Sequence, residues 1–227
     1  MTLLVFGATG VVGGAVVDRA LQESRVSEVV VVTRRPLTRG HARLRSIIHA
    51  DFSSFTTVAG EFDGVQSCIY TLGMPWPRAK SKAQYREVTH DYAVAAAQAL
   101  ASVNPSARFC FVSGHGAGRE SRQAWARIKA ETEDAVTAIF GAHARIFRPG
   151  YIYPVRGRET AYWGDAVMRP FMAFRRQLAK YITDSDTVAQ ALVYAALGGD
   201  VPSQAGNLEI QRAAEAYAAG ELQISDC

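Results

Sequence analysis

The sequence predicts an α/β protein in which one doubly wound parallel sheet lies between two layers of helices. Three observations support this fold class: short runs of apolar residues, helical apolar spacing between successive runs, and a glycine-rich turn directly after the first run. Runs that are apolar at every position are typical of parallel strands buried on both faces. Because crossovers between parallel strands are right-handed, helices are expected on both sides of the sheet.

The first strand, the first helix and the second strand form a βαβ unit. Leu3–Phe6 is an apolar run, and Val12, Val16 and Ala20 follow it at helical spacing. The next run, Val29–Thr33, is rich in β-branched residues, which favour strands, and a proline follows shortly after it. Two strands separated by one helix are the repeating unit of the predicted sheet.

The same alternation continues through the middle of the chain. A helix is expected over 82–102, because apolar residues share one face and an Asn-Pro pair then ends the pattern. A second helix is expected over 121–140, with an inward stripe made of Trp125, Ile128, Thr132, Ala135 and Ile139. Further strands are expected at 46–49, 65–70, 108–113 and 144–147.

The composition and the last third of the chain complete the fold prediction. Of the 227 residues 48% are hydrophobic and 20% charged, which suffices for one substantial core and excludes a disordered or fibrous chain. No linker rich in Pro, Ser or Gly separates two halves, so we expect one domain over 1–227, with 151–227 as a smaller C-terminal lobe. The elements expected in this lobe are helices at 163–178 and 184–197, the second capped by Asp184 or Ser185, and a strand at Leu208–Ile210.

Charge and cysteine content exclude several classes of partner. The net charge of +4 comes from scattered basic residues, so we expect no nucleic-acid partner. No apolar run approaches the length of a membrane span, and the apolar N-terminus is too short for a signal peptide, so we expect neither a membrane partner nor export. Cys68, Cys110 and Cys227 are too widely spaced for a disulfide framework, and the histidines show no ligand spacing, so we expect a cytoplasmic protein without a metal.

A glycine pattern lies between the first strand and the first helix. It fits G-x-x-G-x-x-G and consists of Gly7, Ala8, Thr9, Gly10, Val11, Val12 and Gly13. The first glycine allows a tight turn, the second lets the backbone approach a pyrophosphate, and the third lets helix and strand pack closely. The amides and dipole of a helix N-terminus favour an anion there. The pattern predicts a dinucleotide phosphate site, and the alternative is a purely structural turn.

The end of the second strand favours one nicotinamide cofactor over the other. Sites specific for NAD usually present a carboxylate there to the ribose 2′-hydroxyl, whereas this chain has Thr33, Arg34 and Arg35. Guanidinium groups hold a 2′-phosphate by charge-assisted hydrogen bonds, so NADP(H) is predicted, the alternative being two solvated arginines. Asp51 and Phe52 follow the third strand and suit the amino group and ring of adenine, although a simple turn fits them as well.

These motifs, in this order, resemble the atypical short-chain dehydrogenase/reductase superfamily. The residues that carry the resemblance are Gly7 to Gly13, Thr33-Arg34-Arg35, Asp51, Cys68-Ile69-Tyr70-Thr71-Leu72-Gly73, Val112-Ser113 and Phe147-Arg148-Pro149-Gly150. Between Leu3 and about Leu197 the chain is similar to NAD(P)-binding proteins of the Tat-interacting oxidoreductase-like and NmrA-like groups. The resemblance implies a Rossmann fold, with further cofactor contacts from Leu72, Gly73, Pro149 and Gly150.

The resemblance also implies a catalytic serine, tyrosine and lysine. In active members the serine orients a carbonyl, the tyrosine of a Tyr-x-x-x-Lys motif supplies the proton, and the lysine assists the tyrosine and binds the nicotinamide ribose. Ser113 and Lys129 match the serine and the lysine, whereas Trp125 stands at the tyrosine position. The i, i+4 spacing keeps Trp125 and Lys129 on one helix face, but an indole does not ionise near neutral pH. The family's ordinary carbonyl reduction therefore lacks its acid.

The missing tyrosine leaves three hypotheses. Hydride passes to an acceptor that needs no enzymatic proton, such as a flavin or quinone; a hydroxyl of Tyr151 or Tyr153 replaces the phenol; or the bound cofactor is a signal to a regulated protein partner. We expect an NADP(H)-dependent oxidoreductase that acts on a small molecule, with a non-catalytic NADP(H) sensor as the alternative. Sugar-nucleotide epimerases and dehydratases depend on the same absent tyrosine. A hydrolase is not expected, because Ser113 lacks the flanking glycines of a nucleophile elbow.

Three further groups of residues have both a functional and a structural interpretation. His115, in the loop after the fifth strand, is either a base or an ordinary loop histidine. A basic cluster after Pro77 either steers an anion to the cofactor mouth or forms an exposed charged loop; it consists of Arg78, Lys80, Lys82 and Arg86. Trp76, Tyr162 and Trp163 either line a substrate cleft or pack a lid.

Overall fold

Seven strands form one parallel sheet in the computed structural model, which describes residues 1–38, 40–155, 178 and 180–220. Their order is β3-β2-β1-β4-β5-β6-β9, so the chain begins near the middle of the sheet and builds toward both edges. Every pairing between neighbours is parallel. The strands are β1 (Thr2–Phe6), β2 (Glu28–Thr33), β3 (Leu44–Ile48), β4 (Val65–Tyr70), β5 (Arg108–Val112), β6 (Ala144–Phe147) and β9 (Gln204–Ala205). The predicted doubly wound sheet is confirmed.

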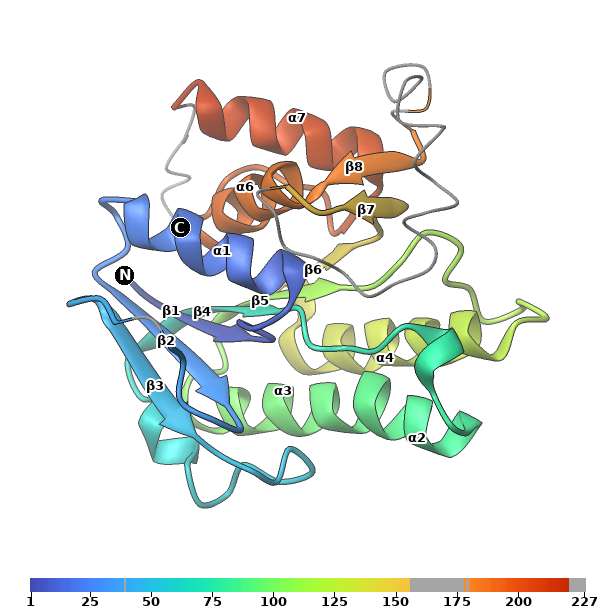
Figure 1. Ribbon diagram of the computed structural model, residues 1–227, viewed down its shortest axis with the longest axis horizontal. Helices are drawn as coiled ribbons and strands as arrows, with labels where there is room; N and C mark the ends of the chain where they lie inside the picture. Colours follow the sequence, from blue (N-terminus) through green and yellow to red (C-terminus); the bar gives the residue numbers. More distant parts are fainter. Residues whose placement is uncertain (39, 156–177, 179, 221–227) are drawn as a thin grey trace.

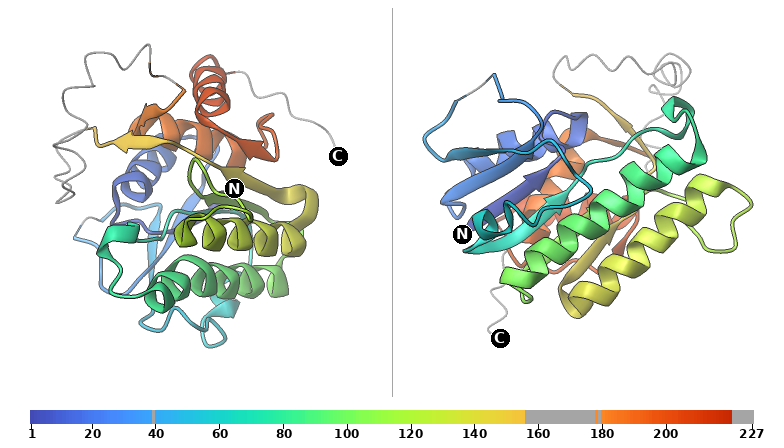
Figure 2. Two further views of the ribbon diagram at one scale, coloured as in Figure 1. Left: turned by 90° about the vertical axis from the view of Figure 1, so that its right-hand side faces the viewer. Right: turned by 90° about the horizontal axis from the view of Figure 1, so that it is seen from below.

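Helices cover both faces of this sheet, as Figures 1 and 2 show. The helices on one side are α1 (Val11–Gln22), α6 (Ser185–Ala196) and α7 (Asn207–Ala218), and those on the other are α2 (Lys82–Arg86), α3 (Tyr92–Val103) and α4 (Ala124–Phe140). A second, small parallel sheet pairs β7 (Tyr151–Tyr153) with β8 (Ile182–Asp184). The shorter helical segments are η1 (Ala59–Phe62), η2 (Trp76–Arg78), η3 (Glu87–Asp91) and η4 (Gly141–His143).

Burial on both faces explains why the central strands are apolar at every position. In β1, Leu3 and Val5 belong to the core beneath α1 and α6, whereas Leu4 and Phe6 belong to the core beneath α3. All four side chains are fully buried. Since successive strand residues point to opposite faces, neither face of β1 tolerates a polar residue.

The inward stripe predicted for α4 is partly wrong. Ile128 and Thr132 are buried as expected, but the buried line continues through Val136 and Phe140 instead of Ala135 and Ile139, which with Trp125 are only half-buried. The Phe140 ring stacks on Phe109 of β5 with ring centroids 5.0 Å apart. This contact sets the rotation of the last turns of α4, and helical periodicity alone does not determine it.

The helix predicted over 82–102 is interrupted at its centre. A five-residue π-helical segment, η3, separates α2 from α3 and carries Glu87 at its start. A π turn inserts one extra residue per turn and therefore shifts which side chains face the sheet. The side chains around Glu87 consequently point in other directions than they would in a regular α-helix.

The C-terminal predictions have different outcomes. The helix expected at 184–197 is confirmed, and Asp184 caps it by accepting hydrogen bonds from the backbone N–H groups of Asp186 and Thr187 at 2.9 and 2.8 Å. The strand expected at Leu208–Ile210 is wrong, because these residues form the first turn of α7. That helix begins after Gly206, whose N–H donates to Glu209 Oε2 at 3.0 Å, and it buries residues at helical spacing. The helix expected at 163–178 lies outside the described residues, apart from its last position.

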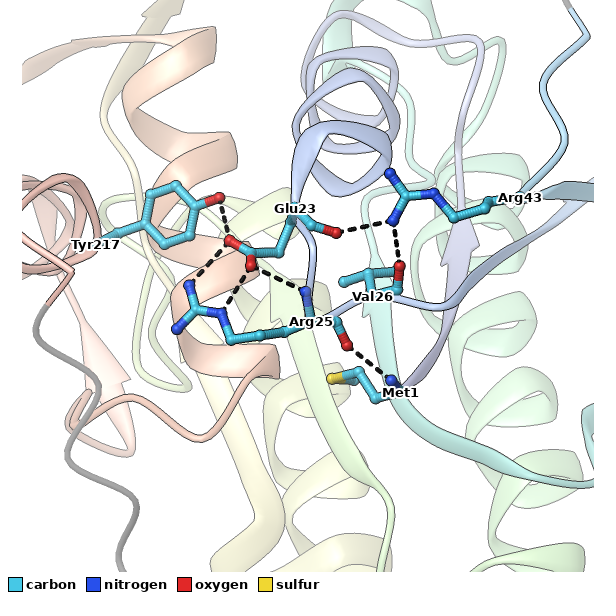
Figure 3. A network of polar contacts seen from close by, with 6 residues as sticks. All are labelled: Met1, Glu23, Arg25, Val26, Arg43 and Tyr217. Atoms are coloured by element: carbon cyan, nitrogen blue, oxygen red, sulfur yellow. Dashed lines mark hydrogen bonds and ion pairs between the residues drawn. The ribbon is translucent and has the colours of Figure 1, made fainter.

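A network of polar contacts fastens α7 to the end of α1 (Figure 3). The Tyr217 hydroxyl donates to Glu23 Oε2 at 2.8 Å, and the Arg25 guanidinium donates to both oxygens of the same carboxylate at 2.7 and 2.9 Å. Arg43 donates to the backbone carbonyl of Leu21, in the last turn of α1, and to those of Glu23 and Val26, which follow that helix. The Tyr217–Glu23 contact joins residues 194 positions apart and holds the N-terminal βαβ unit against the C-terminal helix, while the arginines fix the carboxylate and the chain that follows α1.

Candidate active site

The glycine turn after β1 is shaped by close backbone packing. Gly7 has a φ of +84°, a conformation that favours glycine, and Gly10 N–H donates to Gly7 O at 2.9 Å. A methyl group on Gly13 would lie 2.1 Å from Gly7 O and 2.5 Å from Thr71 Oγ1, so α1 packs against the turn without room for a side chain. Gly10 also caps α1 without a side-chain hydrogen bond. The backbone at this helix N-terminus is thus shaped as a phosphate cradle requires.

A cavity of about 580 Å³ opens beside this turn. It joins the turn to the ends of β2 and β4, and its lining includes Gly7, Ala8, Thr9, Thr33, Arg34, Arg35, Phe52 and Leu72. Val11 and Val12 lie in the first turn of α1, just beyond it. The cavity therefore brings together the glycine turn and the two arginines, which the sequence analysis assigned to one cofactor. In a doubly wound sheet, ligands bind in the crevice at the carboxyl ends of the strands where the strand order reverses, as it does here between β1 and β4.

The arginines at the end of β2 are presented to solvent. Thr33 Oγ1 donates to Arg35 O at 2.7 Å and so fixes the turn that carries both arginines. Arg34 and Arg35 are exposed, and neither pairs with a carboxylate among the described residues. Two unpaired cations beside the glycine turn are suited to bind an additional phosphate.

A second cavity, of about 330 Å³, adjoins the first and shares Arg34, Phe52 and Leu72 with it. Gly73, Val88 and Tyr92 also line it, so the slot combines apolar and aromatic side chains with polar ones, as a flat base with hydrogen-bonding edges requires. Of the predicted adenine pair, Phe52 lines both cavities, whereas Asp51 Oδ1 accepts hydrogen bonds from Ser53 N and Oγ, which lower the pKa of Asp51.

Glu87, which the sequence analysis missed, also lines the second cavity. Its Oε1 accepts a hydrogen bond from the Tyr92 hydroxyl at 3.1 Å. Glu87 begins the π segment, and no feature of the sequence signals that irregular turn. The carboxylate is a hydrogen-bond acceptor within the slot, as an adenine amino group requires.

A buried polar network occupies the expected catalytic end of the site. Ser113 follows β5 and is buried, and its hydroxyl donates to Glu133 Oε1. Glu133 is also buried on α4 and forms an ion pair with Arg148, whose Nε lies 3.0 Å from Glu133 Oε1. The Ser113 hydroxyl is therefore directed toward α4 and serves this network. Glu133 was not singled out from the sequence, although it follows Lys129 by four residues and so shares its helix face.

Lys129 lies next to this network. Its Nζ donates to Ser113 O at 3.1 Å and sits 5.7 Å from the centroid of the Phe111 ring. Burial lowers the pKa of Lys129 to about 8, while the Glu133 carboxylate opposes this shift. A methyl group on Gly114 would lie 3.6 Å from Lys129 Cδ, so the loop after β5 passes directly along the lysine side chain.

Trp125 occupies the position one turn before Lys129. Its indole Nε1 donates to Gln123 Oε1, and its ring faces Gly116, where an added methyl would lie 3.6 Å from Cη2. These contacts hold the indole against the loop 114–118. The chemistry of the group is that of a hydrogen-bond donor without a titratable proton near neutral pH.

The loop after β6 is joined to three other segments. His115 N–H donates to Pro149 O at 2.7 Å, and Gly150 N–H donates to Asn207 Oδ1 at 2.8 Å. A methyl group on Gly150 would lie 2.1 Å from Tyr181 O, so the segment before β8 packs directly on Gly150. The proposed substitute donors Tyr151 and Tyr153 are the first and last residues of β7 and are half-buried.

Two of the remaining sequence candidates, Arg86 and Trp76, have structural contacts. Arg86 of the basic cluster forms an ion pair with Glu131, and Trp76 packs edge-on against Tyr85 with ring centroids 4.9 Å apart. Tyr162 and Trp163 lie outside the described residues.

Among the residues that the structure describes, no cluster of His, Cys, Asp and Glu suits a metal ion. None of the described helices is long and apolar enough to cross a membrane.

Comparisons with known proteins agree with this geometry. The profile of a protein family described as NAD(P)H-binding matches residues 7–149. The chain is 28% identical to protein fmp52, mitochondrial, of Aspergillus clavatus over 214 residues, covering 88% of this chain and 89% of the relative. It is 30% identical to the leucinostatins biosynthesis cluster protein T of Purpureocillium lilacinum, but over only 50% of this chain and 43% of that protein.

Solved structures with the same fold include enzymes of two kinds. A short-chain dehydrogenase from Burkholderia cenocepacia in complex with NADP superposes with a TM-score of 0.66 at 16% identity, covering 96% of this chain and 92% of that one. The UDP-glucose 4-epimerase of Thermotoga maritima superposes with a TM-score of 0.65 at 15% identity, covering 86% and 73%. At these identities the likeness is one of fold.

Proposed function

Since the chain belongs to the NAD(P)H-binding family and has a Rossmann fold of the atypical short-chain dehydrogenase/reductase type, we propose that it binds NADP(H) and transfers hydride to a small acceptor. One observation carries the choice of NADP(H): Arg34 and Arg35 line the same cavity as the glycine turn. No carboxylate stands at the end of β2, where an NAD site presents one. The two guanidinium groups therefore suit a 2′-phosphate.

Different residues bind the different parts of NADP(H) in this proposal. The N-terminus of α1, with Gly10 and Gly13, holds the pyrophosphate. Phe52, Leu72 and Gly73 enclose the adenine, and Pro149 and Gly150 border the nicotinamide half. Lys129 binds the nicotinamide ribose, and its Nζ is held in place by Ser113 O. The bound cofactor supplies a hydride. The contribution of the protein is to hold the donor and the acceptor in register and to exclude water.

The nature of the acceptor follows from the groups at the catalytic end. Trp125 offers no titratable proton, and the Ser113 hydroxyl donates to Glu133 instead of to the site. A quinone or flavin is reduced by hydride more readily than a simple ketone, because its product anion is stabilised within its own ring system. We therefore propose a quinone, a flavin or an activated carbonyl as the acceptor, bound beside the small sheet of β7 and β8.

The proposal is tested by measuring NADPH oxidation against a panel of quinones, flavins and carbonyl compounds, alongside calorimetric titration with NADP⁺. Binding together with turnover supports an oxidoreductase. Binding without turnover of any acceptor contradicts hydride transfer and favours the second candidate, a protein that senses NADP(H) and signals to a protein partner. The same two observations, Trp125 and the Glu133-bound Ser113, favour that candidate.

The compartment is a separate proposal. Cys68 and Cys110 are buried thiols without a disulfide, which is consistent with a reducing compartment such as the cytoplasm predicted from the sequence. The fmp52 relatives carry the word mitochondrial in their names. Fractionation of the source cells, followed by detection of the chain, distinguishes the cytoplasm from an organelle.

A further inference from the structure

A carboxylate from an irregular helical turn lines the slot beside the cofactor cavity. Glu87 begins the π-helical segment η3 and borders this cavity of about 330 Å³ together with Phe52, Leu72 and Tyr92. Its side chain is exposed, so a ligand in the slot can reach it. Among the described residues that line the slot, Glu87 is the only acidic one.

The slot lies where the adenine half of a dinucleotide is expected. It shares Arg34, Phe52 and Leu72 with the larger cavity beside the glycine turn. A dinucleotide with its pyrophosphate at the N-terminus of α1 and its 2′-phosphate at Arg34 therefore extends its base into the slot. Phe52 and Tyr92, whose ring centroids are 6.0 Å apart, offer aromatic surface to a purine. The polar groups of the slot are then left to recognise the edge of the base.

The Tyr92 hydroxyl fixes the orientation of the Glu87 carboxylate by donating to Glu87 Oε1 at 3.1 Å. Burial and this hydrogen bond raise the pKa of Tyr92, so the phenol keeps its proton at neutral pH and remains a donor. Glu87 Oε2 has no hydrogen-bond partner among the residues that the structure describes. One carboxylate oxygen is thus held by the protein, and the other is available to accept a hydrogen bond from a ligand.

Asp51, to which the sequence analysis assigned the adenine amino group, is placed differently. It lines neither of the two cavities. Its Oδ1 accepts hydrogen bonds from Ser53 N at 2.9 Å and from Ser53 Oγ at 2.5 Å. The Asp51 carboxylate is therefore engaged by its own turn, whereas the Glu87 carboxylate faces a cavity.

We propose that Glu87 selects the adenine base of the cofactor by accepting a hydrogen bond from its 6-amino group, and that Tyr92 is the positioning residue of Glu87. The inference rests on the proposed function and identifies the residue that decides which purine the site binds. An amino group donates to a carboxylate, whereas the 6-oxo group of hypoxanthine presents only lone pairs, which a carboxylate repels. A glutamine at this position can donate as well as accept and does not discriminate in this way.

The test compares NADP⁺ with nicotinamide hypoxanthine dinucleotide phosphate, in which an oxygen replaces the 6-amino group and the adjacent ring nitrogen carries a proton. The affinity for each nucleotide is measured by calorimetry for the wild type, Glu87→Gln and Glu120→Gln. Glu120 is the matched control, an exposed carboxylate in the loop after β5 that lines neither cavity. We expect the wild type and the control to bind NADP⁺ roughly 10- to 100-fold more tightly than the analogue, and Glu87→Gln to bind both within about threefold.

Tyr92→Phe tests the positioning role, because it keeps the ring and removes the hydroxyl. This variant should retain a preference for NADP⁺ that is severalfold smaller than that of the wild type. A purely structural role predicts equal losses for both nucleotides, and an unchanged preference would overturn the positioning role.

Three results overturn the selection by Glu87. In the first, Asp51→Asn abolishes the preference and Glu87→Gln retains it, which returns the assignment to Asp51. In the second, the wild type binds both nucleotides equally or prefers the analogue, and the proposed binding of NADP(H) is left intact. In the third, neither nucleotide binds, which contradicts the proposed function as well.

Discussion

The substitution Gly13→Ala tests the phosphate cradle directly. The added methyl would lie 2.1 Å from Gly7 O and 2.5 Å from Thr71 Oγ1, whereas ordinary contacts begin at 3.4 Å. Both atoms belong to tightly packed segments, since Gly7 O accepts a hydrogen bond from Gly10 and Thr71 Oγ1 donates to Phe6 O. The N-terminus of α1 must therefore move away by about 1 Å.

Overpacking of this kind costs about 3 kcal/mol, and the helix preference of alanine over glycine offsets about 1 kcal/mol of it. The net loss of about 2 kcal/mol lowers the melting temperature of a chain of this size by roughly 4 to 8 °C. A displaced helix N-terminus also loses charge-assisted hydrogen bonds to phosphate worth about 1.5 to 3 kcal/mol each, so the Kd for NADP⁺ should rise at least tenfold.

The assay is thermal unfolding followed by circular dichroism, with and without NADP⁺. At a ligand concentration 100 times the Kd, a bound ligand stabilises the native state by about 2.7 kcal/mol, which is easily resolved. Gly60→Ala is the control, because its added methyl meets no atom within 4 Å. If Gly13→Ala has the melting temperature of the wild type and NADP⁺ raises it by the same amount, two claims are wrong: that Gly13 is packed without room for a methyl group, and that the N-terminus of α1 binds the pyrophosphate.

Three further substitutions test other parts of the structure. Arg34→Ala should weaken NADP⁺ binding roughly 10- to 100-fold in calorimetry and leave NAD⁺ binding unchanged; equal losses for both cofactors would refute a 2′-phosphate contact. Hydrogen bonds from Arg25 and Tyr217 lower the pKa of Glu23 to about 2, so the carboxylate contributes stability above pH 4.5 that is lost as the pH falls toward 2. Glu23→Gln should remove this acid-dependent part of the urea-unfolding free energy, and an unchanged pH profile would contradict the network. Because burial lowers the pKa of Lys129 to about 8, the wild type should gain stability between pH 8 and 10.5, where the unfolded chain binds more protons; Lys129→Met should lack this gain.

The fold was predictable because its signals are local. Val29–Val32 is apolar at every position, and the structure buries that segment on both faces beneath α1 and α3. The G-x-x-G-x-x-G spacing predicts a tight turn between a strand and a helix. In the structure Gly13 packs against Gly7 O without room for a side chain, as that turn requires. By contrast, Leu208–Ile210 was mistaken for a strand, because a segment of three residues is too short to show the period that separates strand from helix.

The catalytic end was less predictable because its contacts are distant in sequence. Ser113 and Lys129 were found by their spacing, but the direction of the Ser113 hydroxyl depends on Glu133, and Glu133 in turn on Arg148. The rings of His115 and Tyr181 also meet edge to face, and this contact depends on how β8 packs beside β7. No local pattern encodes such contacts, because tertiary packing determines which side chains meet.

The most direct test of the account is calorimetric titration of the chain with NADP⁺ and NAD⁺ side by side. If Arg34 and Arg35 bind the 2′-phosphate, the Kd for NADP⁺ should be at least tenfold lower than the Kd for NAD⁺. This difference should disappear when both arginines are replaced by alanine. Equal affinities would contradict the assignment of the two arginines. Failure of both nucleotides to bind would contradict the cradle itself.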